Sequence, residues 1–160
     1  MYYTTYSSPI GKLLIVSDGN AIYKVSFNYT NVSKSKNFVQ NNELDIFKDI
    51  KHYFDDYFAG KNPDMNFKLI PQGSKFRQNV WKIISKIPYG EITTYGDIAS
   101  EISPTMSAQA VGGAVGANPI AILIPCHRVL GKNNKLTGYA AGLDKKIMLL
   151  EIENFLNYSL

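Results

Sequence analysis

The chain has 160 residues, of which 45% are hydrophobic and 19% charged, so it can bury a core and disorder is not expected. No apolar run reaches the length of about 18 residues that a membrane helix needs, and no secretory signal is visible. The net charge of +4 is compatible with nucleic-acid binding, while the single cysteine, Cys126, excludes an internal disulfide and favours a reducing, cytoplasmic location.

The N-terminal part of the sequence predicts a β-meander over residues 2–29. The segments Lys12–Ser17 and Ala21–Phe27 are rich in β-branched and aromatic residues, and they flank the hairpin signal Asp18-Gly19-Asn20. The polar stretch 30–42 is expected to be a loop.

An amphipathic helix is predicted over Glu43–Ala59, because aromatic and aliphatic residues recur there at helical spacing and Gly60 follows. Another strand is expected over Met65–Ile70. The residues Pro71-Gln72-Gly73 then break the pattern. We therefore expect two domains, a small α/β domain over residues 1–72 and a mainly helical domain over residues 73–160.

Three helices are predicted in the first part of the second domain. Ser74 can cap a helix over 75–87, Thr94 and Asp97 form a capping box for a helix over 95–102, and Ser107 can cap a helix over 108–117. The last two helices, joined by a tight turn, indicate a helix-turn-helix.

The helix predicted over 108–117 contains three glycines and four alanines. Glycine costs about 1 kcal/mol per helical position relative to alanine, so a compensating gain is expected. Small side chains let the backbone approach another surface closely. That surface is either a neighbouring helix or a nucleic-acid groove, and the pattern alone leaves both open.

The strand-like apolar run 120–124 leads through Pro125 to Cys126, which we expect to lie at a fixed turn. A thiol is a nucleophile only as the thiolate, and His127 and Arg128 are candidates to lower its pKa. The alternative is that Cys126 is a small buried hydrophobe. A last helix is predicted over 143–156.

These elements resemble the O6-alkylguanine-DNA alkyltransferases, also called methylated-DNA–protein-cysteine methyltransferases. The resemblance spans about residues 74–153 and is most specific in the run Pro125-Cys126-His127-Arg128-Val129 after Asn118-Pro119. It also rests on Val80-Trp81, Ile87-Pro88-Tyr89-Gly90, Thr94-Tyr95-Gly96, Ala110-Val111-Gly112-Gly113, Gly138-Tyr139, Gly142-Leu143 and Leu149-Leu150.

The resemblance implies an α+β fold, with a ribonuclease H-like N-terminal domain and a winged-helix-like DNA-binding domain. It also implies direct-reversal repair of double-stranded DNA that carries O6-alkylguanine. The protein would act as a monomer, enter the minor groove, flip the damaged base and move the alkyl group to its own cysteine. No cofactor and no metal are expected, and the cysteine is not regenerated.

The site roles are carried over from the family position by position. Cys126 would be the nucleophile and alkyl acceptor, His127 its base through a water molecule, and Glu153 the group that orients His127. Tyr95 would donate a proton or hydrogen bond to the flipped guanine. The substrate and DNA contacts would come from the helix, the turn and the loop near Cys126, at Gln109, Ala110, Gly112, Gly113, Asn118, Val129, Tyr139 and Ala140.

Two positions depart from the family pattern. Gln109 stands where an arginine usually intercalates in the gap left by the flipped base, so weaker binding or slower flipping is expected. Ala140 stands where many relatives have serine, so a hydroxyl contact to the base is lost.

Two other functional classes remain as alternatives. A lesion sensor would bind damaged DNA without transfer, but the related sensors lack the acceptor cysteine. A hydrolase would need an oxyanion site, and a dithiol redox enzyme would need a second cysteine.

Overall fold

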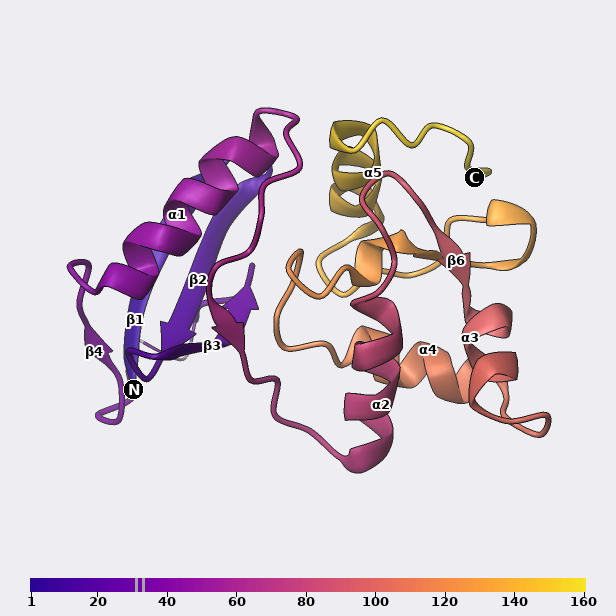
Figure 1. Ribbon diagram of the computed structural model, residues 1–160, viewed down its shortest axis with the longest axis horizontal. Helices are drawn as coiled ribbons and strands as arrows, with labels where there is room; N and C mark the ends of the chain where they lie inside the picture. Colours follow the sequence, from indigo (N-terminus) through magenta and orange to yellow (C-terminus); the bar gives the residue numbers. More distant parts are fainter. Residues whose placement is uncertain (31, 33) are drawn as a thin grey trace. The chain divides into compact units, whose positions relative to one another are not determined.

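The computed structural model describes residues 1–30, 32 and 34–160. The chain forms two compact units, Met1–Gln72 and Gly73–Leu160 (Figure 1). The first contains a sheet and one long helix, and the second is mainly helical, so the predicted α+β class is confirmed. No described helix is long and apolar enough to cross a membrane.

The first unit is built on a five-stranded sheet in the order β4-β1-β2-β3-β5. The meander β1 (Tyr2–Ser8), β2 (Gly11–Ser17) and β3 (Ala21–Ser26) is antiparallel, as the β-branched and aromatic segments and the hairpin signal predicted. The two edge strands, β4 (Val39–Gln40) and β5 (Lys68–Leu69), pair in parallel with β1 and β3.

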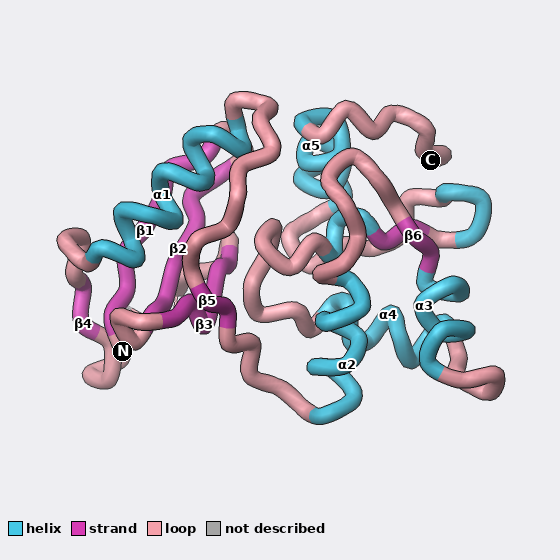
Figure 2. The backbone as a smooth tube through the Cα atoms, viewed as in Figure 1, coloured by secondary structure: helices cyan, strands magenta, loops and turns pink. Residues whose placement is uncertain are grey.

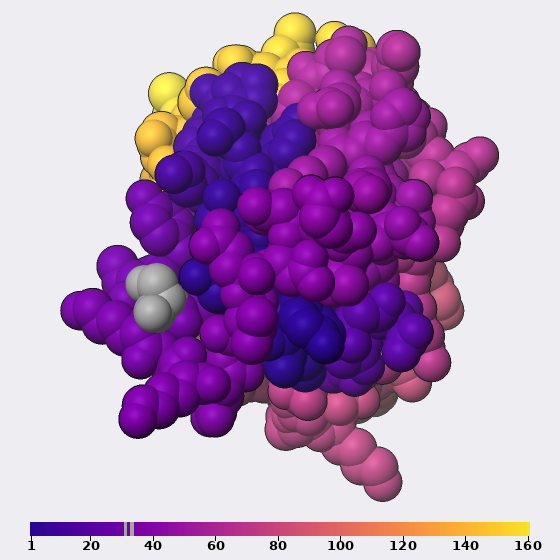
Figure 3. Space-filling model, turned by 90° about the vertical axis from the view of Figure 1, so that its left-hand side faces the viewer, coloured from indigo at the N-terminus to yellow at the C-terminus, as the bar shows by residue number. Residues whose placement is uncertain are grey.

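Both faces of the central strand are covered, which is why residues 13–17 are all buried. Helix α1 (Asp45–Phe58) lies along one face (Figures 1 and 3). The ring centroid of its Phe54 lies 5.3 Å from that of Tyr6. On the other face Leu14 and Val16 pack with Val32.

Three local expectations in the first unit need correction. Residues 39–40, expected in a loop, pair with the edge of β1, because Val39 and Asn41 donate backbone hydrogen bonds to it. Residues 31 and 33 of that expected loop lie outside the described residues. The strand expected over 65–70 shrinks to two residues, and α1 begins two residues later than predicted.

In the second unit the three predicted caps are present. At the start of α2 (Lys75–Ile84) the Ser74 side chain accepts a hydrogen bond from Arg77 N. At the start of α3 (Tyr95–Ile102) the Thr94 side chain accepts one from Asp97 N. At the start of α4 (Ala108–Gly116) the Ser107 side chain accepts one from Ala110 N. Each bond satisfies an amide that a helix start leaves open. The indole of Trp81 donates to Ala114 O at 2.9 Å and so ties α2 to α4.

Two predicted helices end early for local reasons. α2 ends at Ile84 rather than 87, because Lys86 N and Ile87 N bond to Ile83 O and Ile84 O in a tighter 3₁₀-type turn, after which Pro88 disfavours helical backbone at Ile87. α5 (Leu143–Ile152) ends four residues before the predicted 156. Asn154 there adopts a left-handed conformation, and Phe155 N donates back to Leu150 O, as in a helix C-cap.

The strand-like reading of residues 120–124 is wrong. Residues 121–124 form a turn, in which Ile122 has a φ of 71°, and Ile120 makes only a single β-bridge (Figure 2). The apolar side chains of this segment are buried in the core instead of pairing in a sheet. The strands of this unit are two short parallel ones that the sequence did not predict, β6 (Thr93–Thr94) and β7 (Val129–Leu130).

Candidate active site

Cys126 opens a short 3₁₀-helix, η1 (Cys126–Arg128), immediately after the turn. It is 6% exposed and is held mainly by Asn118. The amide nitrogen of Asn118 donates to Ile124 O at 2.8 Å and to the Cys126 Sγ at 3.1 Å, while its oxygen accepts from Ile120 N at 2.9 Å. One side chain therefore fixes the turn and the sulfur together.

The sequence predicted that His127 and Arg128 lower the pKa of the Cys126 thiol, but the groups that lower it are others. Burial raises the pKa of Cys126, and the hydrogen bond from Asn118, the charge of Lys146 and the hydroxyl of Tyr139 oppose that effect. His127 and Arg128 instead bond to Glu153. Successive residues of a 3₁₀-helix point about a third of a turn apart, which separates the three side chains.

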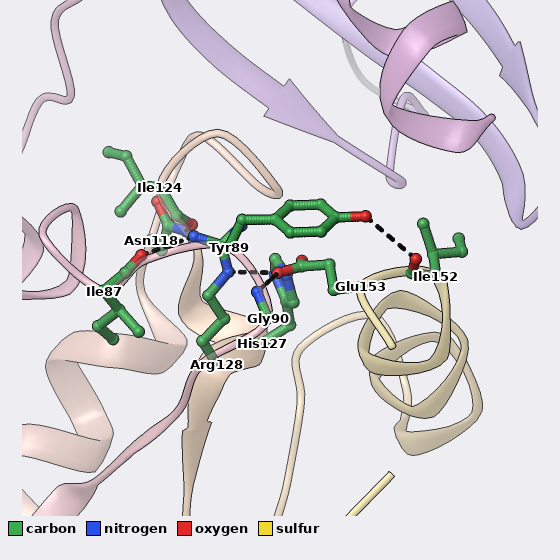
Figure 4. Close-up of polar contacts among 9 residues, drawn as sticks. All are labelled: Ile87, Tyr89, Gly90, Asn118, Ile124, His127, Arg128, Ile152 and Glu153. Carbon is green, nitrogen blue, oxygen red and sulfur yellow. Dashed lines mark hydrogen bonds and ion pairs between the residues drawn. The ribbon is translucent and has the colours of Figure 1, made fainter. Parts of the chain in front are cut away.

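His127, Arg128 and Glu153 form a buried network (Figure 4). The His127 Nε2 contacts one carboxylate oxygen of Glu153, and the other oxygen accepts from Arg128 Nε at 2.6 Å and from Gly90 N at 3.2 Å. Burial alone would raise the pKa of Glu153, but His127 and Arg128 outweigh it and lower the pKa to about 2. Glu153 is therefore a carboxylate at neutral pH.

This charge state assigns the tautomer of His127. A carboxylate only accepts hydrogen bonds, so Nε2 carries the proton and Nδ1 presents a lone pair. Nδ1 is buried and has no hydrogen-bond partner among the described residues. Burial also lowers the pKa of His127, which keeps the ring neutral. A neutral imidazole with an open lone pair is able to accept a proton.

Arg128 ties this network to the surrounding chain. Its NH1 donates to Ile87 O at 2.7 Å, and its guanidinium lies 5.9 Å from the ring centroid of Tyr89. Tyr89 in turn donates to Ile152 O at the end of α5 (Figure 4). These contacts connect the segment 87–90, η1 and the end of α5.

Tyr95 is the first residue of α3, directly after the cap residue Thr94. Its ring lies beside Gly112, where an added Cβ would be 3.8 Å from it. The Thr137 hydroxyl donates to the Tyr95 oxygen at 3.4 Å, which leaves the phenolic proton free to point elsewhere. Burial raises the pKa of Tyr95, so the phenol is protonated at neutral pH.

The loop after β7 supplies Tyr139 and Ala140. The Tyr139 hydroxyl is close enough to the sulfur for each group to shift the other's pKa, although it has no well-formed hydrogen bond among the described residues. Ala140 is exposed, but the Val129 side chain is fully buried and points away from any surface. No group of three or more His, Cys, Asp or Glu in the described chain could hold a metal ion.

Helix α4 presents its small residues outward. Gln109, Ala110 and Gly113 are exposed, and Gly112 is half-buried. A Cβ added at Gly113 or Gly116 would meet nothing within 4 Å. Packing within the chain therefore does not account for these two glycines. Close packing against a neighbouring helix, one of the two explanations that the sequence left open, therefore does not apply to Gly113 or Gly116.

Sequence reasoning missed two residues that contact Tyr95, namely Thr137 and Lys146. Thr137 gave no signal, since it lies in an irregular loop. Lys146 did give one, because it precedes the buried Leu149 and Leu150 at helical spacing. A lysine on the core face of an amphipathic helix is a rare placement that marks a paired or functional group.

Comparison with known proteins identifies the family. Residues 75–155 match the DNA binding domain of 6-O-methylguanine DNA methyltransferase, and residues 1–71 match its ribonuclease-like domain. The methylated-DNA–protein-cysteine methyltransferase of Haemophilus influenzae is 43% identical, over 96% of this chain and 86% of that protein. That of Methanosarcina acetivorans is also 43% identical, over 96% of this chain and 98% of that protein.

Solved structures agree with the sequence matches. Mycobacterium tuberculosis OGT in complex with DNA superimposes with a TM-score of 0.86 at 38% identity, over 96% of this chain and 92% of that one. A Methanococcus jannaschii O6-methylguanine DNA methyltransferase gives a TM-score of 0.70 at 29% identity, over 98% and 96% of the two chains. The resemblance seen in the sequence is thus confirmed, and the chain belongs to the 6-O-methylguanine DNA methyltransferase family, the methylated-DNA–protein-cysteine methyltransferases.

Proposed function

We propose that this protein repairs O6-alkylguanine in DNA by direct reversal, moving the alkyl group to Cys126 in a single turnover. The observation that carries the proposal is the arrangement around the sulfur. A buried thiol receives a hydrogen bond from Asn118, and η1 also carries a neutral histidine with an open Nδ1. The curated relatives are named for this transfer to a protein cysteine.

The chemistry follows from the charge states of these groups. The thiol proton passes through a water molecule to Nδ1 of His127, and Glu153 stabilises the imidazolium that forms. The sulfur attacks the alkyl carbon, a carbon–sulfur bond forms, and the bond to the guanine oxygen breaks. The electron pair stays on the guanine, which takes a proton from Tyr95. The thioether is stable, so the protein acts once.

Access to a stacked base requires that the base leave the duplex, at a cost of a few kcal/mol. We propose that the exposed small-residue face of α4 approaches the minor groove and that Gln109 fills the gap left by the flipped guanine. Glutamine can bond to the orphan cytosine, but it lacks the charge and planar stacking of arginine. The M. tuberculosis relative solved in complex with DNA supports DNA as the partner.

One copy of the protein suffices in this proposal, because every group invoked belongs to residues 87–153 of a single chain. The lesion-sensor alternative is disfavoured, since a sensor has no need of an acceptor thiol. The thiol-hydrolase alternative would require repeated turnover at Cys126.

The test is a single-turnover transfer assay. Duplex DNA with one O6-methylguanine, labelled in the methyl group, is mixed with excess protein, and peptide mass spectrometry locates the label. One methyl on Cys126, with guanine restored, is the expected result. Cys126→Ser is the matched control, which should bind the lesion without taking up label. Tight binding by the wild type with no transfer would indicate a sensor, and release of label without protein modification would indicate a hydrolase.

A further inference from the structure

The tight turn at residues 88–91 lies against the end of α5, where Glu153 stands. Glu91 N donates to Pro88 O at 3.1 Å and closes this turn. Its third residue, Gly90, has a φ of 77°, in the region that favours glycine. A Cβ at Gly90 would also come within 3.2 Å of Glu153 O. The turn therefore approaches the helix end more closely than another side chain at this position would allow.

Glu153 occupies a position that α5 by itself holds weakly. It is the C-cap residue, directly after Ile152, and the last carbonyl groups of a helix have no partner within the helix, so that helix ends fray. The negative end of the helix dipole also disfavours a carboxylate there. This carboxylate is nevertheless buried and contacts Nε2 of His127. Its place must therefore be fixed by groups outside the helix.

Tyr89 and Gly90 hold this helix end from outside (Figure 4). The Tyr89 hydroxyl donates to Ile152 O at 3.1 Å, one of the carbonyl groups that the helix leaves open. Burial raises the pKa of Tyr89, so the phenol keeps the proton that it donates. Its ring centroid lies 5.9 Å from the guanidinium of Arg128, and Gly90 N donates to the Glu153 carboxylate at 3.2 Å. Tyr89 thus contacts both the residue before Glu153 and the arginine that binds its carboxylate.

We propose that Tyr89 is a positioning residue for the transfer, which fixes the end of α5 so that the Glu153 carboxylate stays on Nε2 of His127 and Nδ1 stays open as the proton acceptor. The inference rests on the proposed function, in which that acceptor takes the thiol proton. Without the bond from Tyr89 to Ile152 O, the carboxylate can move off the ring. Either imidazole nitrogen can then carry the proton.

A displaced carboxylate would also weaken the base. The charged groups that face His127 are Glu153, Arg128 and Lys146. Burial lowers the pKa of His127, the two cations add to that effect, and Glu153 opposes it. A histidine that loses its carboxylate is therefore a weaker proton acceptor, and the transfer then needs a higher pH.

The first measurement determines the tautomer of His127 by NMR of the imidazole nitrogens and needs no substrate. The chain has two histidines, so His52→Gln, at an exposed position on α1, leaves the signals of His127 alone. In this background Nε2 should give the signal of a protonated nitrogen and Nδ1 that of an unprotonated one. Tyr89→Phe, which keeps the ring and removes the hydroxyl, should move both signals toward the average of the two tautomers. Unmoved signals would overturn the proposal.

Tyr158→Phe is the matched control. Tyr158 also donates its hydroxyl to the last turn of α5, at 3.2 Å from Glu151, but this bond is exposed. Its loss should leave the His127 signals at their wild-type positions. Shifts of equal size in Tyr89→Phe and Tyr158→Phe would show that any loosening of the helix end moves the histidine, and would reject the role of Tyr89.

The second measurement separates positioning from stability. The rate of reaction with free O6-benzylguanine is followed against pH in the wild type, Tyr89→Phe and Tyr158→Phe. Near neutral pH the rate of Tyr89→Phe should fall about fivefold, as for the loss of one hydrogen bond, and it should recover at higher pH. A protein that is only less stable loses the same fraction of its rate at every pH. A uniform loss, or none, would refute the role.

These outcomes are separable from those of the repair assay. A wild-type protein whose His127 tautomer depends on Tyr89, but which takes no alkyl group from DNA or from the free base, would retain the inference and lose the proposed function. Transfer by Tyr89→Phe with the wild-type pH profile would retain the function and reject the role of Tyr89.

Discussion

The side chain of Asn118 donates to the sulfur of Cys126 at 3.1 Å and to the carbonyl of Ile124 at 2.8 Å. The same amide thus shapes the turn and favours the thiolate. A carboxamide has the two donors that this arrangement needs, and a carboxylate has none.

Asn118→Asp should therefore lower the reactivity of the Cys126 thiol more than the stability of the fold. The new carboxylate removes the donor and places a like charge beside the sulfur, which raises the thiol pKa. We expect the iodoacetamide profile to move to higher pH, with a loss of about tenfold in rate near neutral pH. Asn79→Asp, on the exposed surface of α2, is the matched control and should leave the profile unchanged.

The buried carboxylate of Glu153 should make stability depend on pH in the acid range. Its pKa in the folded state is about 2, below the ordinary value of 4.5, so its contribution is complete above that ordinary value and is lost as pH falls toward 2. The loss should reach about 3 kcal/mol, measured as the free energy of unfolding in urea across this range.

Glu153→Gln should show a smaller slope of stability against pH there, although it is less stable overall. Glu43→Gln, which alters an exposed ion pair with Lys48, should keep the wild-type slope. Equal slopes in the wild type and Glu153→Gln would mean that another group dominates acid unfolding.

Gly113→Ala should separate stability from DNA binding. The added methyl group meets no protein atom, and alanine favours the helix by up to about 1 kcal/mol, so the melting temperature should rise. If α4 lies close to the DNA backbone, the same methyl group should weaken lesion binding in a fluorescence titration. Reaction with free O6-benzylguanine should stay unchanged, since the sulfur is untouched. Unimpaired DNA binding would argue against close approach at this position.

Gln109→Arg should speed the repair of duplex DNA more than the reaction with free O6-benzylguanine. Arginine restores a planar cation that can stack in the gap left by the flipped base, whereas the free base needs no flipping. Single-turnover rates on the two substrates measure this ratio. Equal acceleration of both reactions would show that Gln109 acts on the chemistry and not on the DNA.

Much of this protein could be read from its sequence. The helices of the second unit were located within a few residues, because Ser74, Thr94 and Ser107 are local cap signals and apolar spacing is a local property. The meander followed from β-branched and aromatic segments and from the turn residues between them. The Pro125–Val129 run identified the family, which the comparisons confirm.

Other features depended on contacts between distant residues. The run 120–124 has the composition of a strand, but its side chains fill a core that the sequence does not display. The acceptor atom of His127 depends on Glu153, 26 residues away, and the Nζ of Lys146 comes to 5.8 Å from the centroid of the Tyr95 ring only once α5 has packed. Local chemistry determined the elements and the nucleophile. Tertiary structure alone decided the charges around the sulfur, since pKa values depend on burial and neighbours that only the folded chain brings together.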